Sequence, residues 1–446
     1  MTSPEWSSVL DLYQQILCAG VLEYLQKQAG LRVKRGIYGA QVVLWLMMLQ
    51  RLNHRGTLVS AVQLLIAGAA EPLLVGCRRV HQKRISCRTG GYCQARQKLP
   101  KLLCRQVNRE ILERLRQVLN SSLPAEQSNI FVLDGSTLEL ESSRQLRNCY
   151  PPPHNQHGRS HWPLLRLVVM HDAGTGLAQP PCWGPMNGPH ATSEQALAEA
   201  AIQALPPDSV VVADRNFGVF SVAYAAQNRR IAVLLRLTDV RARKLAGSIS
   251  KAGDYSVAWR ASRWDGGKGH RHPWPCEASV PGRLIAIRAG RGKSKRWFYL
   301  FTTLEGSIDE IVQLYHRRWS IETDLRSLKR TVQLHHIRAQ SDEMMEKEIL
   351  MAMSAYNLVR AVMCLAARRS RVDPRQLSFS QVLTLVEAAW PKLVLAPTQQ
   401  QHDHEFLRVL DLAAQCTLPR RRKRRSYPRL QWRRGGESRL RKAEEN

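Results

Sequence analysis

The sequence has no long apolar run and no secretion signal. Its longest strongly apolar stretch, residues 42–49, is eight residues long, whereas a helix that crosses a bilayer needs roughly 20. The N-terminus lacks the basic start and the apolar core of a signal peptide. We therefore expect a protein that neither spans a membrane nor leaves the cytoplasm.

Cysteine is scattered, and no CxxC pair occurs among the ten cysteines of the 446 residues. This pattern indicates reduced or incidental thiols in place of a disulfide framework. His270, His272 and Cys276 are close enough in sequence to form part of a zinc site, but no fourth ligand accompanies them. A structural zinc site is therefore the less favoured interpretation.

Acidic residues are scarce relative to basic ones. The chain has 66 Lys and Arg against 36 Asp and Glu, a net charge of +30. The stretch 420–434 has nine of the positive charges and no acid, so most of the excess belongs to the rest of the chain. A basic body of this kind is typical of proteins that bind a long phosphate backbone. The charge by itself does not distinguish an enzyme from a ribosomal or chromatin protein.

Residues 1–125 have a helical pattern and predict an N-terminal helical, DNA-binding domain. Helices are expected at about 6–28, 38–52, 57–69 and 100–119. The basic segment 86–100 interrupts the pattern, and its hydroxyls, glycine pair and cations suit phosphate contact. Within this segment we assign Arg96 and Lys98 to DNA. A solvated turn is the alternative.

Residues 126–237 predict the first part of an α/β core. Strands are expected at 129–137, 163–171 and 177–183, then a helix at 191–205, a strand at 209–217, a helix at 217–228 and a strand at 231–237. This is the element order of an RNase H-like domain, a mixed sheet flanked by helices. Asp134 and Asp214 each close an apolar strand, and ligand sites lie at the carboxyl ends of such strands. Ordinary turn aspartates are the alternative.

The rest of the chain divides into three further regions. Residues 238–307 are rich in Gly, Arg, Ser and Trp and predict a β-rich insertion. Residues 308–372 predict the second part of the core, and 373–446 a C-terminal helical region with a basic tail.

Residues 308–333 have apolar spacings of three and four, which predict one helix. At about 100° per residue, Tyr315, Arg318, Glu322 and Lys329 share a strip about 60° wide. Bulky apolar neighbours indicate that Glu322 is partly buried, and a buried carboxylate needs a cation or metal. The alternative is an amphipathic helix with a common Arg–Glu pair.

The spacing Tyr315-x2-Arg318-x3-Glu322-x6-Lys329 resembles the YREK signature of the insertion sequence 4 family of DDE transposases. The resemblance extends over roughly residues 85–335. It includes the motif His154-Asn-Gln-His-Gly-x-Ser-His-Trp-Pro163, the motif Asp214-Arg-x-Phe217 and the segment from Tyr92 to Pro100. The family usually has Gly or Ala where this chain has Asn216, and Asn tolerates a left-handed backbone.

The resemblance implies cut-and-paste transposition at terminal inverted repeats by a homodimer in the bacterial nucleoid. It implies that Asp134, Asp214 and Glu322 are the catalytic, metal-binding triad and that Tyr315, Arg318 and Lys329 contact DNA. Three converging carboxylates repel one another, and two magnesium ions, with manganese as a substitute, would remove the conflict and hold the oxygens of a phosphoryl transfer. Some relatives stack a flipped base on an insertion Trp, for which Trp274 and Trp297 are candidates beside ordinary packing.

Two other functions stay open on the sequence alone. A repair or junction nuclease with an RNase H-like fold would need the three acids without the helical N-terminus. A catalytically silent DNA-binding protein would not need the acids at all, and all three are present.

Overall fold

The computed structural model describes residues 9–32, 36–53, 56–75, 77–82, 84–120, 129–155, 158–262, 274–275, 277–289, 296–394 and 398–418. The zinc alternative at His270, His272 and Cys276 lies outside the described residues, and so does the basic stretch 420–434. The other nine cysteines are free thiols, as expected.

The N-terminal region is helical, as predicted. Its elements are α1 (Val9–Ile16), α2 (Ala19–Gln28), α3 (Ala40–Leu52), α4 (Leu58–Ile66), η1 (Glu71–Leu73), α5 (Arg78–His81), α6 (Gly90–Lys98) and α7 (Lys101–Asn120). The helix expected at 6–28 is two helices, which meet at Cys18.

The segment 86–100 was expected to break the helical pattern, and that expectation is wrong because it contains α6. Tyr92, Arg96 and Leu99 recur at spacings of four and three on one side of α6 and are all buried. The Tyr92 hydroxyl donates a hydrogen bond of 2.6 Å to Gln50 Oε1 on α3. Burial of this side therefore outweighs the low helix propensity of Gly90 and Gly91.

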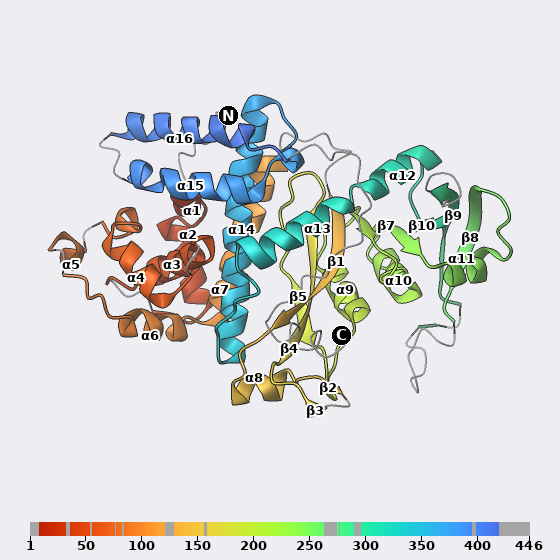
Figure 1. Cartoon of the computed structure of the whole chain (residues 1–446), viewed down its shortest axis with the longest axis horizontal. Coiled ribbons are helices and arrows are strands. Elements are labelled where there is room, and N and C mark those ends of the chain that lie inside the picture. The colour runs from red at the N-terminus through yellow and green to blue at the C-terminus, as the bar shows by residue number, and fades with distance from the viewer. Residues whose placement is uncertain are drawn as a thin grey trace, which may run out of the picture.

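One eight-stranded mixed sheet lies beside these helices (Figure 1). Its spatial order is β5-β4-β1-β6-β7-β10-β9-β8. The strands are β1 (Ile130–Glu139), β4 (Leu164–Asp172), β5 (Cys182–Pro185), β6 (Val210–Ala213), β7 (Ala232–Leu237), β8 (Gly253–Arg260), β9 (Ser279–Ala289) and β10 (Arg296–Thr302). A separate small sheet pairs β2 (His154–Asn155) with β3 (Gly158–Arg159), and α8 (Arg144–Cys149) precedes it.

Strands β1, β6 and β7 run parallel, and the other neighbouring strands of the large sheet pair antiparallel. Together with α9 (Glu194–Gln203) and α10 (Phe220–Gln227) they give the predicted RNase H-like α/β core. The β-rich region 238–307 begins with α11 (Asp239–Ala246), and its strands extend this same sheet because β10 pairs with β7.

The two faces of the sheet belong to two hydrophobic clusters, because side chains alternate along a strand. Phe131 and Leu133 of β1 pack in the cluster that contains residues of α9 and α10. Val132 of β1 and Val212 of β6 pack in the opposite cluster, which contains α13 (Trp319–Arg326) and α14 (Asp342–Ser370). Continuing the alternation by two residues puts Asp134 and Asp214 on the α13 face.

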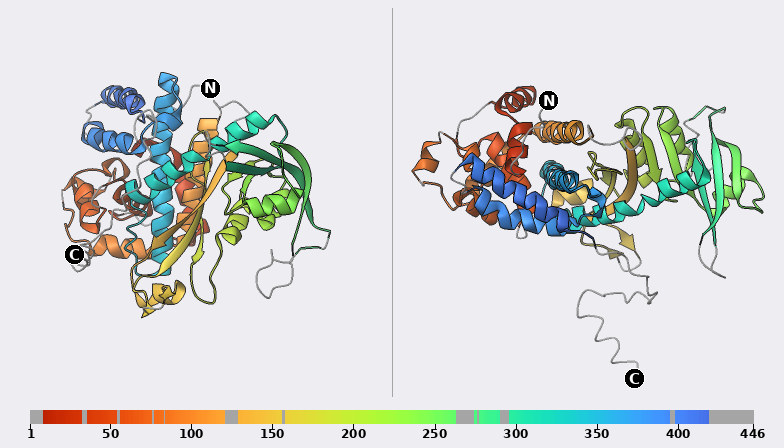
Figure 2. Two further views of the ribbon diagram at one scale, coloured as in Figure 1. Left: turned by 45° about the vertical axis from the view of Figure 1, so that its right-hand side comes forward. Right: turned by 90° about the horizontal axis from the view of Figure 1, so that it is seen from above.

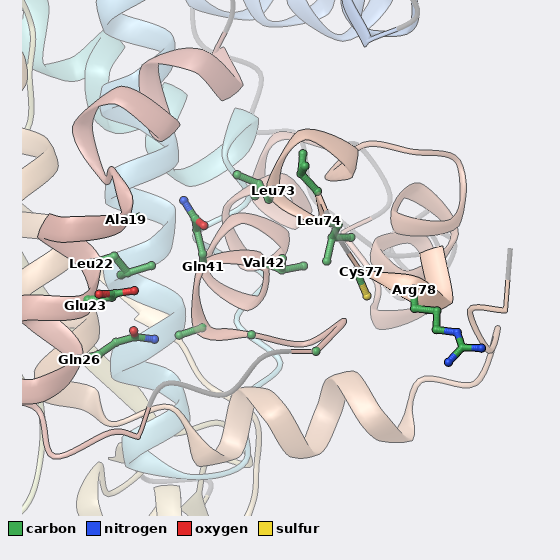
Figure 3. A pocket seen from close by; sticks show the side chains of 14 residues that line it. Ala19, Leu22, Glu23, Gln26, Gln41, Val42, Leu73, Leu74, Cys77 and Arg78 are labelled. Carbon is green, nitrogen blue, oxygen red and sulfur yellow. The ribbon is translucent and has the colours of Figure 1, made fainter. Parts of the chain in front are cut away.

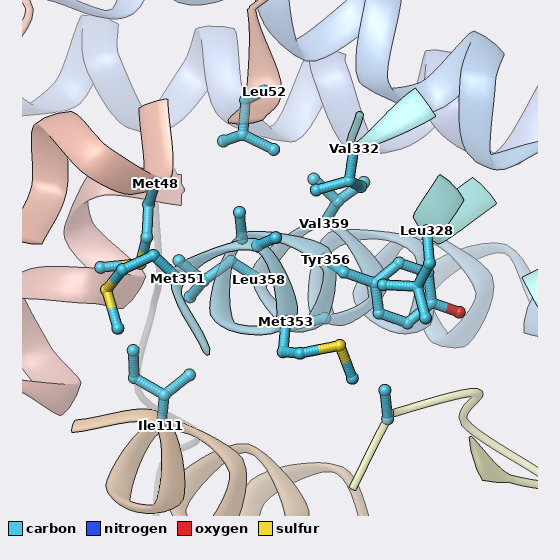
Figure 4. Packing of buried hydrophobic residues seen from close by; sticks show 14 of the residues in the cluster. Met48, Leu52, Ile111, Leu328, Val332, Met351, Met353, Tyr356, Leu358 and Val359 are labelled. Atoms are coloured by element: carbon cyan, nitrogen blue, oxygen red, sulfur yellow. The ribbon is translucent and has the colours of Figure 1, made fainter. Parts of the chain in front are cut away.

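Helix α14 runs between the N-terminal helices and the sheet (Figures 1 and 2). Its length and apolar composition would let it cross a membrane, but 94% of its most apolar window is buried inside the protein, so it is a core helix. Its side chains interdigitate with those of α3, α7 and the segment after α13 (Figure 4). After it come η5 (Pro374–Gln376), α15 (Phe379–Val394) and α16 (Gln399–Gln415), which make the C-terminal region helical as predicted.

The helix expected at 308–333 is interrupted twice. α12 (Ile308–His316) ends in a tight turn in which the backbone N–H groups of residues 317, 318, 320 and 321 each bond to the carbonyl three residues earlier. α13 follows, and then the π-helical turn η4 (Ser327–Thr331). A tight turn and a wide turn change the angle per residue, so the four residues of the strip do not keep the single face predicted for a regular helix.

Candidate active site

Asp134 and Asp214 lie side by side on adjacent parallel strands. Leu133 of β1 faces Ala213 of β6, the last pair of the parallel ladder, so each aspartate directly follows a member of that pair, and the charge of Asp214 acts on Asp134. Asp134 does not close its strand as expected, because β1 continues to Glu139 in its ladder with β4. Only β6 ends there, which opens the sheet edge beside the aspartates.

The surroundings of Asp134 raise the pKa of its carboxyl group. Its pKa is raised to about 6: burial raises it most and the charges of Asp214 and Glu194 add to this, while the Gly135 N–H and the cation of Arg318 lower it. That N–H donates a 2.8 Å hydrogen bond to Asp134 Oδ1. Asp214 Oδ1 accepts a 2.8 Å bond from the Asn216 N–H in the turn that follows β6. Each aspartate is thus oriented by a backbone donor of its own loop or strand.

Glu194 is a further carboxylate at this site that the sequence analysis missed. It begins α9, and its charge contributes to the raised pKa of Asp134. A Cβ added at Gly135 would lie 2.7 Å from the Glu194 carboxyl carbon, so the Glu194 carboxylate lies directly over this glycine. Glu194 also accepts a hydrogen bond from the side chain of Asn216. In the sequence, Ser193 and Glu194 mark the start of a helix. That pattern indicates a helix cap and does not indicate a catalytic or metal-binding role.

Asn216, which stands where the family usually has Gly or Ala, does not use a left-handed backbone. Its side chain instead ties the Asp214 turn to the start of α9. Gln195 Nε2 donates to the Asn216 carbonyl at 2.9 Å and to its Oδ1 at 3.1 Å. Together with Glu194, these contacts form a polar clamp of Glu194, Gln195 and Asn216 around the turn.

Glu322 lies on α13 with Arg318 beside it. Arg318 Nη2 is 3.6 Å from Glu322 Oε1, and the side chain of Glu322 is 47% exposed against 11% for Arg318. The expectation that Glu322 is partly buried is therefore wrong. The buried carboxylate of α13 is Asp324, on the other side of the helix. The guanidinium of Arg318 lies 5.4 Å from the ring centre of Trp319 and 5.9 Å from that of Tyr315.

Tyr315 and Lys329, both expected at the DNA surface, have internal contacts in this structure. Tyr315 is 4% exposed and meets the ring of Phe298 edge-on, with centroids 5.4 Å apart. Lys329 Nζ donates a 3.0 Å hydrogen bond to the Thr137 carbonyl, three residues beyond Asp134 on β1. Burial, followed by the nearby Arg330, lowers the pKa of Lys329. Tyr315 is therefore a support for Arg318, and Lys329 ties η4 to the strand of Asp134.

The two cations assigned to DNA in segment 86–100 have different surroundings. Arg96 is 7% exposed and donates at 2.5 Å to Glu348 Oε1 on α14, so the assignment of Arg96 to DNA is corrected to an internal ion pair. Glu348 also pairs with Arg51 of α3 at 2.5 Å. Lys98, at the end of α6, is exposed.

The two insertion tryptophans considered for base stacking pack against other rings. Trp274 meets Phe220 edge-on with centroids 5.4 Å apart. Trp297 stacks on Tyr299, and the guanidinium of Arg288 lies 4.7 Å from its ring centre. These contacts match the packing alternative.

A metal ion would meet an incomplete set of ligands in this conformation. Among the residues that the structure describes, no three His, Cys, Asp or Glu side chains are arranged to hold one. Asp134 and Asp214 fit two of the ligand positions, because a cation between them would relieve the repulsion that raises the pKa of Asp134. A cavity of about 460 Å³ between α2, α3 and residues 73–78 is separate from these acids (Figure 3).

The chain is similar to known proteins in sequence and in structure. Residues 125–358, about half of the chain, match the family described as Transposase DDE domain. Over 354 residues the chain is 24% identical to Transposase InsG for insertion sequence element IS4 of Escherichia coli strain K12, an alignment that covers 76% of this chain and 75% of that protein. A solved piggyBac transposase synaptic complex with hairpin DNA matches 90% of this chain and 85% of its own at 10% identity and a TM-score of 0.42.

The matched region begins just before β1 and ends within α14. It therefore includes both aspartates of the sheet, the whole of α13 and the β-rich region between them. Enzymes of this family bind DNA, depend on divalent metal, and cleave and join DNA strands. The chain belongs to the DDE transposase family.

Proposed function

We propose that this transposase serves a bacterial insertion sequence. It binds the terminal inverted repeats of the element as a homodimer, cuts the element out and joins it to target DNA. This takes place at the nucleoid, in the cytoplasm. The name of the Escherichia coli relative, a transposase for an insertion sequence element, supports this assignment over a repair nuclease.

The observation that carries the proposal is the facing pair of Asp134 and Asp214 on the side of the sheet covered by α13. Their carboxylates, joined by Glu322 of α13, are the proposed ligands of magnesium, for which oxygen donors are suited and manganese can substitute. Two bound cations would stabilise the attacking and leaving oxygens of an in-line phosphoryl transfer.

The residues around the acids have separate proposed tasks. Arg318 now neutralises Glu322 at 3.6 Å. When Glu322 turns to the aspartates, the guanidinium is free to form two parallel bonds to a phosphate of the bound DNA end. Lys98 and the other exposed cations hold the DNA through its backbone, which makes binding strongly dependent on salt.

The test separates cleavage from binding. In Asp134→Asn, Asp214→Asn and Glu322→Gln we expect single-turnover cleavage of an inverted-repeat duplex to fall at least about a hundredfold, with DNA affinity within a few-fold of wild type. Glu305→Gln, at an exposed glutamate before α12, is the matched control and should cleave normally. Wild-type cleavage by any of the three variants in magnesium would remove that residue from the proposed triad.

A second measurement tests the metal. Chelation should stop cleavage by the wild-type protein while DNA binding survives, and added magnesium should restore it. Cleavage that continues at full rate in excess chelator would contradict the metal-dependent mechanism for this chain.

A further inference from the structure

A second group of charged side chains lies on the inner side of α13, away from the proposed catalytic acids. At its centre is Asp324, two residues after Glu322, with a side chain that is 6% exposed. The side chain of Asp324 forms ion pairs with Arg375 and Arg360. Neither arginine is close to Asp324 in the sequence.

The contacts to Asp324 come from two separate elements. Arg375 of η5 forms a fork onto the carboxylate, with its two terminal nitrogens 3.1 and 2.5 Å from the two oxygens. Arg360 of α14 lies 3.6 Å away, and the hydroxyl of Tyr356, also on α14, donates at 3.2 Å. Figure 4 shows Tyr356 beside Leu328, just beyond the C-terminal end of α13. Asp324 therefore joins α13 to both α14 and the link that follows it.

The turn between β4 and β5 packs against the two arginines of this group. Gly176 has φ of +76°, and a Cβ there would overlap the guanidinium nitrogens of Arg360 and Arg375. Asn357 of α14 fixes the turn by accepting from the Ala178 N–H at 2.8 Å and donating to its carbonyl at 2.9 Å. Asp172, the last residue of β4, is a second buried acid near this group, and its charge acts on Arg375.

Helix α13 needs an anchor at its middle, because neither of its ends is regular. It is eight residues long, with the tight turn at 317–321 before it and the π-helical η4 after it. In a helix, residues two apart point about 200° from each other. Glu322 is accordingly exposed while Asp324 is buried, so a rotation of α13 that moves one carboxylate must move the other.

We propose that Asp324 and Arg375 are positioning residues, whose buried ion pair sets the rotation and depth at which α13 presents Glu322 to Asp134 and Asp214. This inference rests on the proposed role of Glu322 as a metal ligand. A well-packed apolar pair would stabilise the fold at least as well as a buried ion pair. The directional fork, in contrast, fixes one orientation of the helix.

The anchor is in turn held by the C-terminal end of the described chain. The Ser378 N–H donates to the Cys416 carbonyl at 2.7 Å, and the Leu418 N–H donates to the Gln376 carbonyl at 2.6 Å. These bonds hold the residues that directly follow Arg375. The position of Glu322 therefore depends on residues almost a hundred positions later in the chain.

The experiment measures the magnesium concentration that gives half-maximal single-turnover cleavage of a pre-bound inverted-repeat duplex. Partners that orient metal ligands typically change metal affinity by about 10–100-fold when they are removed. We expect a rise of about tenfold or more for Arg375→Gln and a smaller rise for Arg375→Lys, which keeps the charge and loses the fork. Arg369→Gln, at an exposed arginine paired with Asp411 on α16, is the matched control and should leave the value unchanged.

Thermal unfolding of the same samples separates positioning from folding. If Arg375→Lys lowers the melting temperature and leaves the half-maximal magnesium concentration at the wild-type value, the pair is only structural and the inference is overturned. Should Arg375→Gln fail to fold, Arg375→Lys decides the question alone. Glu322→Gln is measured in parallel. If it cleaves like wild type, the proposed triad fails. If it is inactive while both arginine variants keep the wild-type magnesium dependence, only this inference fails.

Discussion

Helix α13 separates two groups of acids that differ in how their charge is compensated. On the sheet side, Asp134, Asp214 and Glu194 lie together, and no arginine or lysine donates a hydrogen bond to any of them among the described residues. On the inner side, Asp324 forms ion pairs with both Arg360 and Arg375, and burial keeps the neighbouring His171 uncharged.

The difference indicates which group is functional. On the sheet side the cation of Arg318 offsets only part of the effect of burial and of the neighbouring acids, so the pKa of Asp134 stays raised. A bound cation would remove this penalty, so such a group is retained for what it binds. A compensated buried group needs nothing further, and its value is the geometry that it imposes. The following predictions test this contrast, from the largest effect to the smallest.

Asp324→Asn should destabilise the protein much more than Asp214→Asn. The first leaves Arg375 and Arg360 buried without their common partner, which typically costs about 3–5 kcal/mol. The second removes one of several neighbouring negative charges, so the free energy of unfolding in metal-free buffer should stay the same or rise. Denaturant unfolding of both variants gives the comparison. An equal loss in both would show that the charges of the proposed catalytic acids are compensated too.

Arg318→Lys should slow cleavage and leave stability almost unchanged. Lysine keeps the charge beside Glu322 but cannot stack on Tyr315 and Trp319 or form a fork to phosphate. Loss of an oriented charged donor typically costs about 2.7–4 kcal/mol at the transition state, or a hundred- to a thousandfold in rate. Lys329→Arg should slow cleavage less, because Lys329 makes only a single-point contact. Wild-type cleavage of a pre-bound duplex by Arg318→Lys would leave Arg318 a purely structural role.

His171→Leu should remove a pH dependence of stability that originates in the inner group. Burial lowers the pKa of His171 to about 4, below the roughly 6.5 of an unfolded histidine. The unfolded chain therefore binds a proton that the folded chain does not. The neutral His171 makes its full contribution to the free energy of unfolding above pH 6.5. This contribution is lost as the pH falls toward 4, and about 2 kcal/mol of it is gone at pH 5.

Urea unfolding at pH 7 and pH 5 measures this effect. The wild type should lose more stability between the two values than His171→Leu, by about the 2 kcal/mol that histidine linkage gives. His316→Leu, at an exposed position on α12, is the control and should behave like the wild type. Identical losses in wild type and His171→Leu would mean that His171 is not held neutral.

The sequence predicted the elements of the core because their patterns are local. Apolar runs that end in Asp134 and Asp214 predicted β1 and β6, and the spacing of apolar residues predicted most helices. It could not predict that Arg96 is buried, because the partner, Glu348, is some 250 residues away on α14. Two glycines favoured a loop at α6, and tertiary packing of Tyr92 overrode them.

The errors at the candidate site have the same origin. A regular helix was assumed for 308–333, so the tight turn before α13 and the π-helical turn after it were not expected, and Glu322 was predicted to be more buried than it is. Glu194 gave no signal beyond its place at a helix start, because its carboxylate lies over Gly135 of β1, which is distant in the sequence. Asp324 could not be recognised as the buried acid until Arg360 and Arg375 were known to converge on it.

Asn216→Gly should have the smallest effect, because the clamp of Glu194, Gln195 and Asn216 is exposed where the inner group is buried. A solvent-accessible hydrogen bond contributes about 0.5–1.5 kcal/mol at most, and the backbone bond from residue 216 to Asp214 survives in glycine. We expect cleavage within about fivefold of wild type and a melting temperature slightly lower. Asn228→Gly, at the exposed end of α10, is the matched control for the added backbone freedom. If Asn216→Gly abolished cleavage while Asn228→Gly did not, the proposed catalytic acids would depend on fixed polar contacts as much as Asp324 does. The contrast between the two sides of α13 would then no longer hold.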